Sequence, residues 1–165
     1  MQIQHVQQVM TPSLHCCQAS DNLGHAAKLM CEHDCGVIPI VDDEMRVIAV
    51  ITDRDICMAA YAKDKKLTEI GVRPTMSQGL VVCHPEDRVD LAEELMRTHQ
   101  MRRLPVVNAK GQLVGMLALH DLVRAAEQAS SKGCCGTNGV RLKYTARTLA
   151  AICASYLSSV GAKLV

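Results

Sequence analysis

The chain has few of the side chains that proteins use to recognise nucleic acid. Its 165 residues include no Phe, no Trp and only three Tyr. Aromatic stacking, the general way of holding single-stranded bases, therefore lacks its usual residues. The formal net charge of +1 gives no sign of the basic face that duplex DNA requires. The sequence thus favours a neutral soluble protein with no nucleic-acid partner.

The chain also lacks the long apolar runs of exported and membrane proteins. Polar residues such as Gln2, Gln4 and His5 interrupt the amino terminus, which does not resemble a signal peptide. The uncharged stretch Thr148 to Ala162 is shorter than the ~20 apolar residues of a membrane span, and it carries several serines. We therefore expect a cytoplasmic protein that does not enter a membrane.

Cysteine is abundant instead, with nine residues. Thiols stay reduced in a cytoplasmic compartment, and an odd count leaves at least one unpaired. Because free cysteine behaves as a small hydrophobic side chain, most of the nine are expected to fill the core. The exposed pair Cys134-Cys135, between two glycines, leaves a redox role open.

One cysteine cluster has spacing that suggests a metal site. Cys31-x-His33-x-Cys35 closes an expected helix, and His15-Cys16-Cys17 would complete a zinc shell. Ligands at such spacing do not face one point on a helix, and His99 repeats His33 without neighbouring cysteines. Packing is the favoured interpretation, and no metal site is expected.

The chain contains an internal repeat. Shifted by 66 positions without gaps, it matches itself at residue after residue. The matched pairs include Met10 with Met76, Cys17 with Cys83, Asp21 with Asp87, His33 with His99, Pro39 with Pro105, and Asp55 with Asp121. The repeat predicts two copies of one folding unit.

Each copy predicts the order strand, helix, strand, strand, helix. Apolar residues recur at helical spacing from Leu23 and from Val89. Aliphatic runs then predict strands at 38–41 and 47–51, and at 104–107 and 113–117, with polar turns between them. A second helix opens near Thr52 and near Ala118. The fold class is therefore α+β, built from two units packed about a pseudo-twofold.

These residues resemble the CBS (cystathionine-β-synthase-like) domain pair, also called a Bateman module. The resemblance runs from Val9 to Ala126 and is carried by strings that occur in the family order. They are Val9-Met10-Thr11-Pro12, Cys35-Gly36-Val37-Ile38-Pro39-Ile40-Val41-Asp42, Val50-Ile51-Thr52-Asp53-Arg54-Asp55, Arg102-Arg103-Leu104-Pro105-Val106-Val107 and Val114-Gly115-Met116-Leu117. The resemblance implies a homodimeric sensor that holds AMP, ADP, ATP, or S-adenosylmethionine or NAD, in clefts between the two units.

The resemblance also implies site residues. The family signature Ser/Thr-x-x-Asp is here Thr52-x-x-Asp55, with the threonine for phosphate and the aspartate for the ribose. The first site is expected to use Thr52, Asp55, Leu14, His15, Gly36, Val37, Ile38 and Pro39. The second is expected to use Asp121, Leu80, Val81, Arg102, Arg103, Leu104 and Pro105. Arg54 and His120 lie beside the two signatures and would add positive charge.

The same signature has a purely structural interpretation. Ser/Thr-x-x-Asp/Glu is also a helix capping box, which needs no ligand. In the second repeat Ala118 replaces the threonine, yet Asp121 is retained, which favours a ligand role for the acid. The substitution also predicts unequal sites, the second binding more weakly or using Arg103 for the phosphate.

The domain organisation follows from the repeat. Residues 1–66 form the first repeat, 67–126 the second, 127–139 a Ser/Gly-rich linker, and 140–165 a docking helix. No catalytic motif emerges, so the chain is not expected to be an enzyme. Without an attached effector domain, the protein partner is not identified. The alternatives are a ligand-free scaffold and, less favoured, a cysteine-based redox or metal sensor.

Overall fold

The computed structural model describes residues 5–12, 15–77, 79–131 and 148–149. They divide into two compact units. Unit 1 comprises Met1–Pro12, Cys83–Val106 and Gly115–Val165, and unit 2 comprises Ser13–Val82 and Val107–Val114. Each unit therefore draws on both halves of the chain. The tip of the second hairpin, 107–114, belongs to unit 2.

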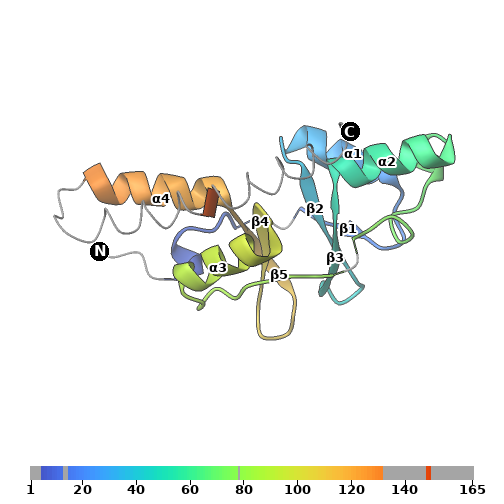
Figure 1. The fold of residues 1–165 in the computed structure, drawn as a ribbon. Coiled ribbons are helices and arrows are strands. Elements are labelled where there is room, and N and C mark those ends of the chain that lie inside the picture. The colour runs from blue at the N-terminus through green and yellow to red at the C-terminus, as the bar shows by residue number, and fades with distance from the viewer. Residues whose placement is uncertain (1–4, 13–14, 78, 132–147, 150–165) are drawn as a thin grey trace. The chain divides into compact units, whose positions relative to one another are not determined.

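Unit 2 contains the predicted strand–helix–strand–strand–helix order. Its elements are β1 (Cys17–Gln18), α1 (Leu23–Glu32), β2 (Val37–Val41), β3 (Val47–Thr52), α2 (Asp53–Lys63) and the 3-10 helix η2 (Leu67–Glu69). The sheet order is β1-β2-β3, with β1 parallel and β3 antiparallel to β2. Helix α1 packs on β2, α2 packs on β3, and the two helices contact each other (Figure 1).

The core of unit 2 shows how a chain without Phe or Trp fills its interior. Ala26, Leu23 and Met30 share one face of α1 and are buried. They meet Ile38, Ile40 and Ile51 of the sheet, and Cys17 of β1 is 1% exposed in the same cluster. Small aliphatic and sulfur-containing side chains thus replace aromatic rings.

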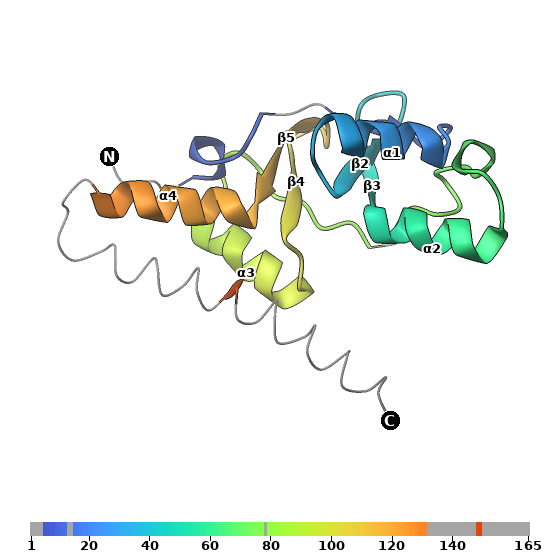
Figure 2. The same cartoon turned by 90° about the horizontal axis from the view of Figure 1, so that it is seen from above.

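Unit 1 repeats the same elements. It contains the 3-10 helix η1 (Val6–Gln8), α3 (Val89–His99), α4 (Leu119–Ser131) and most of β4 (Arg103–Val107) and β5 (Leu113–Ala118), whose hairpin tip belongs to unit 2. Strands β4 and β5 pair, and α3 and α4 lie beside them (Figure 2). A single parallel bridge between Cys83 and Val106 takes the place of β1. The α+β class and the tandem repeat are confirmed, and α4 extends past residue 126, where a linker was expected.

The segment that leads into each repeat packs in the unit of the other repeat. Thr11 exchanges both backbone hydrogen bonds with Met116 in unit 1, each 2.9 Å long. In unit 2 the Ser77 N–H donates to the Val50 oxygen at 2.9 Å. Thr11 matches Ser77 and Met116 matches Val50 in the repeat. Both units are therefore completed in the same way by a distant segment.

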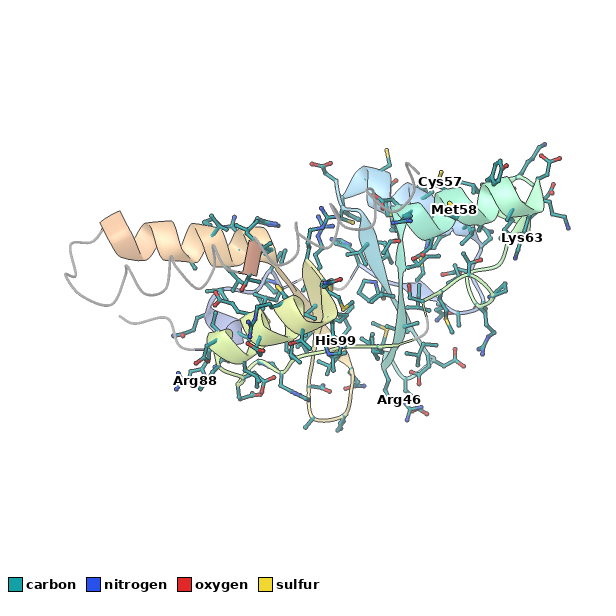
Figure 3. All side chains as sticks on the ribbon, viewed as in Figure 1. Arg46, Cys57, Met58, Lys63, Arg88 and His99 are labelled. Atoms are coloured by element: carbon teal, nitrogen blue, oxygen red, sulfur yellow. The ribbon has the colours of Figure 1, made fainter. Side chains whose placement is uncertain are left out.

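The turns also repeat their backbone geometry. Met45 and Gly111, equivalent residues, have φ values of 63° and 78°. Asp34 and Gln100, also equivalent, have φ values of 47° and 54°. The turn between β2 and β3 carries Arg46, whose side chain points outward (Figure 3). The two copies of the repeat therefore share left-handed backbone conformations at equivalent positions, as well as sequence.

Candidate functional site

The candidate site begins where β3 passes into α2. Thr52 ends the strand in an extended conformation and is the N-cap of the helix. Its hydroxyl accepts a hydrogen bond from the Asp55 N–H (3.2 Å), and the Asp55 carboxylate accepts one from the Thr52 N–H (2.9 Å). This is a complete capping box, so the structural interpretation of Thr52-x-x-Asp55 is confirmed.

The other amides of the first turn of α2 also have partners. The Asp53 N–H donates to the Gly36 oxygen at 3.2 Å, and the Arg54 N–H donates to the Asp53 carboxylate at 2.7 Å. Two aspartates lie in this turn, and their charge is favourable at a helix N-terminus. The same charge opposes a phosphate there, so Arg54, whose side chain is exposed, is the available cation.

Ser77 joins this cluster from outside the first repeat. Its hydroxyl lies 3.3 Å from the Asp55 Oδ2, and its N–H is bonded to Val50 on the neighbouring strand. Ser77 lies outside the Thr52-x-x-Asp55 motif, which does not predict it. The repeat contained the signal, because Thr11 and Ser77 both place a hydroxyl directly after a methionine.

The hydrogen bonds to the Asp55 carboxylate all end on one of its two oxygens, Oδ2. The Thr52 N–H, the Thr52 hydroxyl (2.7 Å) and the Ser77 hydroxyl all bond to Oδ2. Within the part of the chain that the structure describes, no hydrogen bond ends on Oδ1. Asp55 is half-buried, so this oxygen belongs to a fixed carboxylate with acceptor capacity to spare.

Asp121 is placed differently at the start of α4. Its Oδ2 accepts the Ala118 N–H at 2.9 Å, although Ala118 has no capping side chain. Its Oδ1 pairs with the Arg124 guanidinium and lies 3.3 Å from the His120 Nε2, and the side chain is 1% exposed. Asp121 therefore caps α4 without a threonine, so its retention beside Ala118 does not by itself favour a ligand role. Arg124, which the motif does not predict as a partner, pairs with Oδ1, the oxygen for which Asp55 has no hydrogen bond among the described residues.

The remaining expected site residues divide between the units. His15, Gly36, Val37, Ile38 and Pro39 lie in unit 2 with Asp55, and so do Leu80 and Val81, which the sequence had grouped with Asp121. Arg102, Arg103, Leu104, Pro105 and His120 lie in unit 1 with Asp121. Leu14 falls outside the described residues. Ile38, Pro39, Leu104 and Pro105 are buried strand residues, so their side chains belong to the core.

Two backbone positions border the helix starts in the same way. The Arg102 oxygen accepts the Leu119 N–H at 2.9 Å, just as the equivalent Gly36 accepts from Asp53. Val37 pairs with Thr52 across β2 and β3. In unit 2 these contacts bring Gly36, Val37, Thr52, Asp55 and Ser77 to one end of the sheet.

The structure does not bring Cys31, His33 and Cys35 together as their spacing in the sequence suggested. The His33 ring stacks on that of His15, with centroids 3.4 Å apart, while Cys31 is exposed and Cys35 is half-buried. Among the described residues, the metal-ligating atoms that converge, within 4.8 Å of one another, belong to Cys17, Asp21 and His25.

The buried thiols hold their protons strongly. Burial, and then the charge of Asp21 and of Cys16, raises the pKa of Cys17 to about 12. Burial, and then Asp87, raises the pKa of the equivalent Cys83 to about 12. Neither cysteine is a nucleophile at neutral pH, because the thiolate is the reactive form.

The expected features of the tail fall mostly outside the described residues. Cys134-Cys135 and most of the docking helix at 140–165 are among these. Thr148 and Leu149 are helical, Thr148 is buried, and Leu149 borders a pocket of about 500 Å³ along α4. Across the described residues, no helix has the length and hydropathy needed to cross a membrane.

Comparison with known proteins agrees with the repeat and the fold. The family model for the CBS domain matches twice, at residues 6–62 and 68–128. The CBS domain-containing protein YhcV of Bacillus subtilis is 34% identical over 133 residues, covering 81% of this chain and 93% of that protein.

Two solved structures are also similar to this chain. One is CBSX2 in complex with AMP, with a TM-score of 0.67 and 30% identity, covering 76% of this chain and 98% of that one. The other is Hypoxic Response Protein I with two coordinated zinc ions, with a TM-score of 0.67 and 27% identity, covering 73% and 97%.

Proposed function

Because the chain belongs to the CBS domain family, we propose that it is a regulatory module that binds an adenosine nucleotide of the AMP, ADP or ATP class. The observation that carries this proposal is the half-used carboxylate of Asp55. A carboxylate with one fixed and one open oxygen is suited to accept hydrogen bonds from ribose hydroxyls. The similarity to CBSX2, which was solved with AMP, supports the ligand class.

The roles within the site follow from the contacts. Asp55 Oδ1 accepts from the ribose, while Thr52 and Ser77 hold the carboxylate through Oδ2. The first-turn amides of α2 are already bonded, so we assign the phosphate to the exposed Arg54 guanidinium rather than to the helix N-terminus. The base lies against apolar residues of unit 2, for which Val37, Leu80 and Val81 are the candidates.

The second site is the weaker one in this proposal. Both oxygens of Asp121 are engaged, and a ribose would have to displace Arg124 or His120 from Oδ1. Arg102, just before β4, and Arg103, its first residue, are the cations that a phosphate would meet there. Occupancy of one site before the other follows from this difference.

The proposed output is a shift between conformations or assembly states. A ligand changes such an equilibrium by its differential affinity for the two states. We propose a homodimer that a protein effector reads, in the cytoplasm, where its free cysteines stay reduced. The role is regulatory rather than catalytic.

A ligand-free scaffold is the second candidate. The observation that favours it is the capping box itself, which satisfies Thr52, the first-turn amides and one oxygen of Asp55 without any ligand. In that case the signature stabilises α2 and the protein acts through its surfaces alone.

Thermal unfolding with AMP, ADP, ATP, NAD and S-adenosylmethionine separates the two candidates. A ligand at 100 times its Kd adds about 2.7 kcal/mol to the free energy of unfolding. We expect AMP, ADP or ATP to raise the Tm of the wild type and of Asp53→Asn, a matched exposed acid of the same turn, but not of Asp55→Asn. No Tm change with any of the five compounds at millimolar concentration would favour the scaffold. An effect that survives Asp55→Asn would refute the assignment of the ribose.

A further inference from the structure

The chain has one group of metal-ligating side chains that the nucleotide site does not use. Cys17 begins β1, Asp21 lies in the turn after that strand, and His25 lies in the first turn of α1. The sulfur, carboxylate oxygen and imidazole nitrogen lie within 4.8 Å of one another. The sequence spacing pointed instead to Cys31, His33 and Cys35, whose histidine is stacked on His15.

The local backbone holds these three residues in place. Cys17 pairs with Ile40 on β2, which fixes the strand. The Asp21 carboxylate accepts the Gln18 N–H at 2.8 Å, and the Asp21 oxygen accepts the Val72 N–H at 2.8 Å. The His25 N–H is bonded to the N-cap side chain of Asn22 at 3.0 Å. The site is therefore built on ordered backbone rather than on a loose loop.

Two of the three residues have a structural use in both repeats, and the third does not. Cys83 and Asp87 repeat Cys17 and Asp21, and the Asp87 carboxylate accepts the His84 N–H at 2.7 Å as Asp21 accepts that of Gln18. Leu91 stands where His25 stands in the first repeat. The His25 side chain is 47% exposed and lies 3.9 Å from the Asp21 carboxylate. The histidine is thus the addition that turns a shared structural pair into a ligand set.

We propose that Cys17, Asp21 and His25 bind a divalent transition metal ion of the Zn²⁺ class. Zn²⁺ takes thiolate, imidazole and carboxylate ligands in a tetrahedral shell, and three protein ligands leave the fourth position to water. Hard ions such as Mg²⁺ and Ca²⁺ prefer oxygen ligands alone, so the thiol and imidazole select against them.

The distances and charges fit this assignment. Ligand atoms of a zinc shell are about 3.5 Å apart, so the half-exposed His25 and Asp21 side chains need to close by roughly 1 Å around the ion. A bound cation replaces the proton of Cys17 and compensates the charge of Asp21 beside it. The Cys17 side chain is 1% exposed, whereas those of Asp21 and His25 are accessible to solvent. The ion therefore reaches the site from the side on which Asp21 and His25 lie.

The test is Zn²⁺ binding to the full chain, prepared metal-free under reducing conditions. Competition with a chromophoric chelator gives the affinity, and Co²⁺ reports the thiolate through its charge-transfer absorption. We expect one tight equivalent in the wild type, and an affinity at least about tenfold lower in His25→Leu, which copies the residue of the second repeat.

A matched variant distinguishes this site from the one suggested by spacing. His33→Leu removes the imidazole of the Cys31-His33-Cys35 cluster and is expected to bind as the wild type does. Asp21→Asn provides a second removal of a ligand, with the Tm of each metal-free variant as the control for folding. Wild-type affinity in folded His25→Leu, or loss of the tight equivalent in His33→Leu, would overturn the assignment. The absence of any tight equivalent in the wild type would also overturn it, while leaving the nucleotide proposal intact.

Discussion

Arg46 and Gln112 face each other in an antiparallel bridge within unit 2, and they are the same position of the two repeats. On either side, the Val47 N–H donates to the Gly111 oxygen (3.0 Å) and the Leu113 N–H donates to the Met45 oxygen (3.1 Å). Val47 matches Leu113 and Met45 matches Gly111 in the repeat, so the two bonds join equivalent residues in opposite directions. The two turns are therefore paired reciprocally around Arg46 and Gln112, each repeat donating the same bond that it accepts.

The turns beside this bridge share a frame but differ in chemistry. Asp42 accepts the N–H groups of Glu44 and Arg46, and Asn108 accepts those of Lys110 and Gln112. The Arg46 guanidinium pairs with Asp42 at 2.7 Å, where the second repeat has an amide pair. The bonds from backbone N–H groups to Asp42 or Asn108 occur in both turns. They therefore determine the turn conformation, and the pair of side chains that differs between the repeats does not.

The first prediction concerns the left-handed residues of these turns. Gly111→Ala places a Cβ at φ 78° and is expected to lower the free energy of unfolding by about 1 kcal/mol. Met45→Ala is the matched control, because Met45 already carries a Cβ at φ 63°. Urea unfolding measures both variants, and equal losses would contradict the argument from backbone strain.

The second prediction concerns the lead-in segment of unit 1. A Cβ at Gly115 would lie 2.8 Å from the Thr11 backbone oxygen, closer than van der Waals contact allows. Gly115→Ala is therefore expected to cost about 1–3 kcal/mol by overpacking. At Gly71 the nearest atom is 3.5 Å away, in the Pro74 ring, so Gly71→Ala is the control with a small effect. If both variants unfold at the same urea concentration, the close approach of the Thr11 oxygen does not require glycine at position 115.

The third prediction compares the two signature acids without ligand. Asp121→Ala leaves Ala118 uncapped and removes the buried partner of Arg124, so a loss of about 2–3 kcal/mol is expected. Asp55→Ala removes half of a capping box at a less buried position, and about 1 kcal/mol is expected. Chemical unfolding of both variants gives the order, and the reverse order would show that Asp121 is not the more structural of the two.

The fourth prediction follows from the buried thiols. The folded pKa of Cys17 and of Cys83 is about 12, raised by burial above the ordinary value of 9.0. Between these values the folded state binds more protons than the unfolded state, so stability is full below pH 9 and falls as the pH rises towards 12. Each thiol contributes at most about 1.4 kcal/mol per pH unit.

Unfolding free energies measured from pH 8 to 11 test this dependence. Cys83→Ala is expected to have a shallower decline than the wild type, whereas Cys57→Ala, which removes the exposed thiol seen on α2 in Figure 3, is expected to leave the slope unchanged. Identical slopes in all three proteins would exclude thiol ionisation as the cause.

Local patterns in the sequence predict the elements well and the distant contacts poorly. Helical spacing from Leu23 and Val89 predicts α1 and α3, because one face of each is buried. Ser77 escapes this reasoning because it meets Asp55 only after the lead-in segment crosses to the other repeat's unit. The same crossing places Leu80 and Val81 with Asp55 rather than with Asp121.

The role of Asp121 shows a second limit of the sequence. Losing the threonine at position 118 removes one bond of the capping box and leaves the other, since a carboxylate accepts from a backbone N–H whatever the side chain there. The sequence indicates that Asp121 lacks the threonine partner at position 118. It does not indicate that Arg124, one turn later in α4, pairs with Asp121 instead.

The crossing of the lead-in segments also determines what is lost when such a chain is divided between its repeats. A fragment that starts at residue 67 keeps the second repeat but lacks Thr11, which pairs with Met116. A fragment that stops at residue 66 lacks Ser77 and Val72, which are bonded to Val50 and Asp21. Neither half keeps all the backbone bonds of its own unit, so a cut between the repeats removes bonds from both units at once.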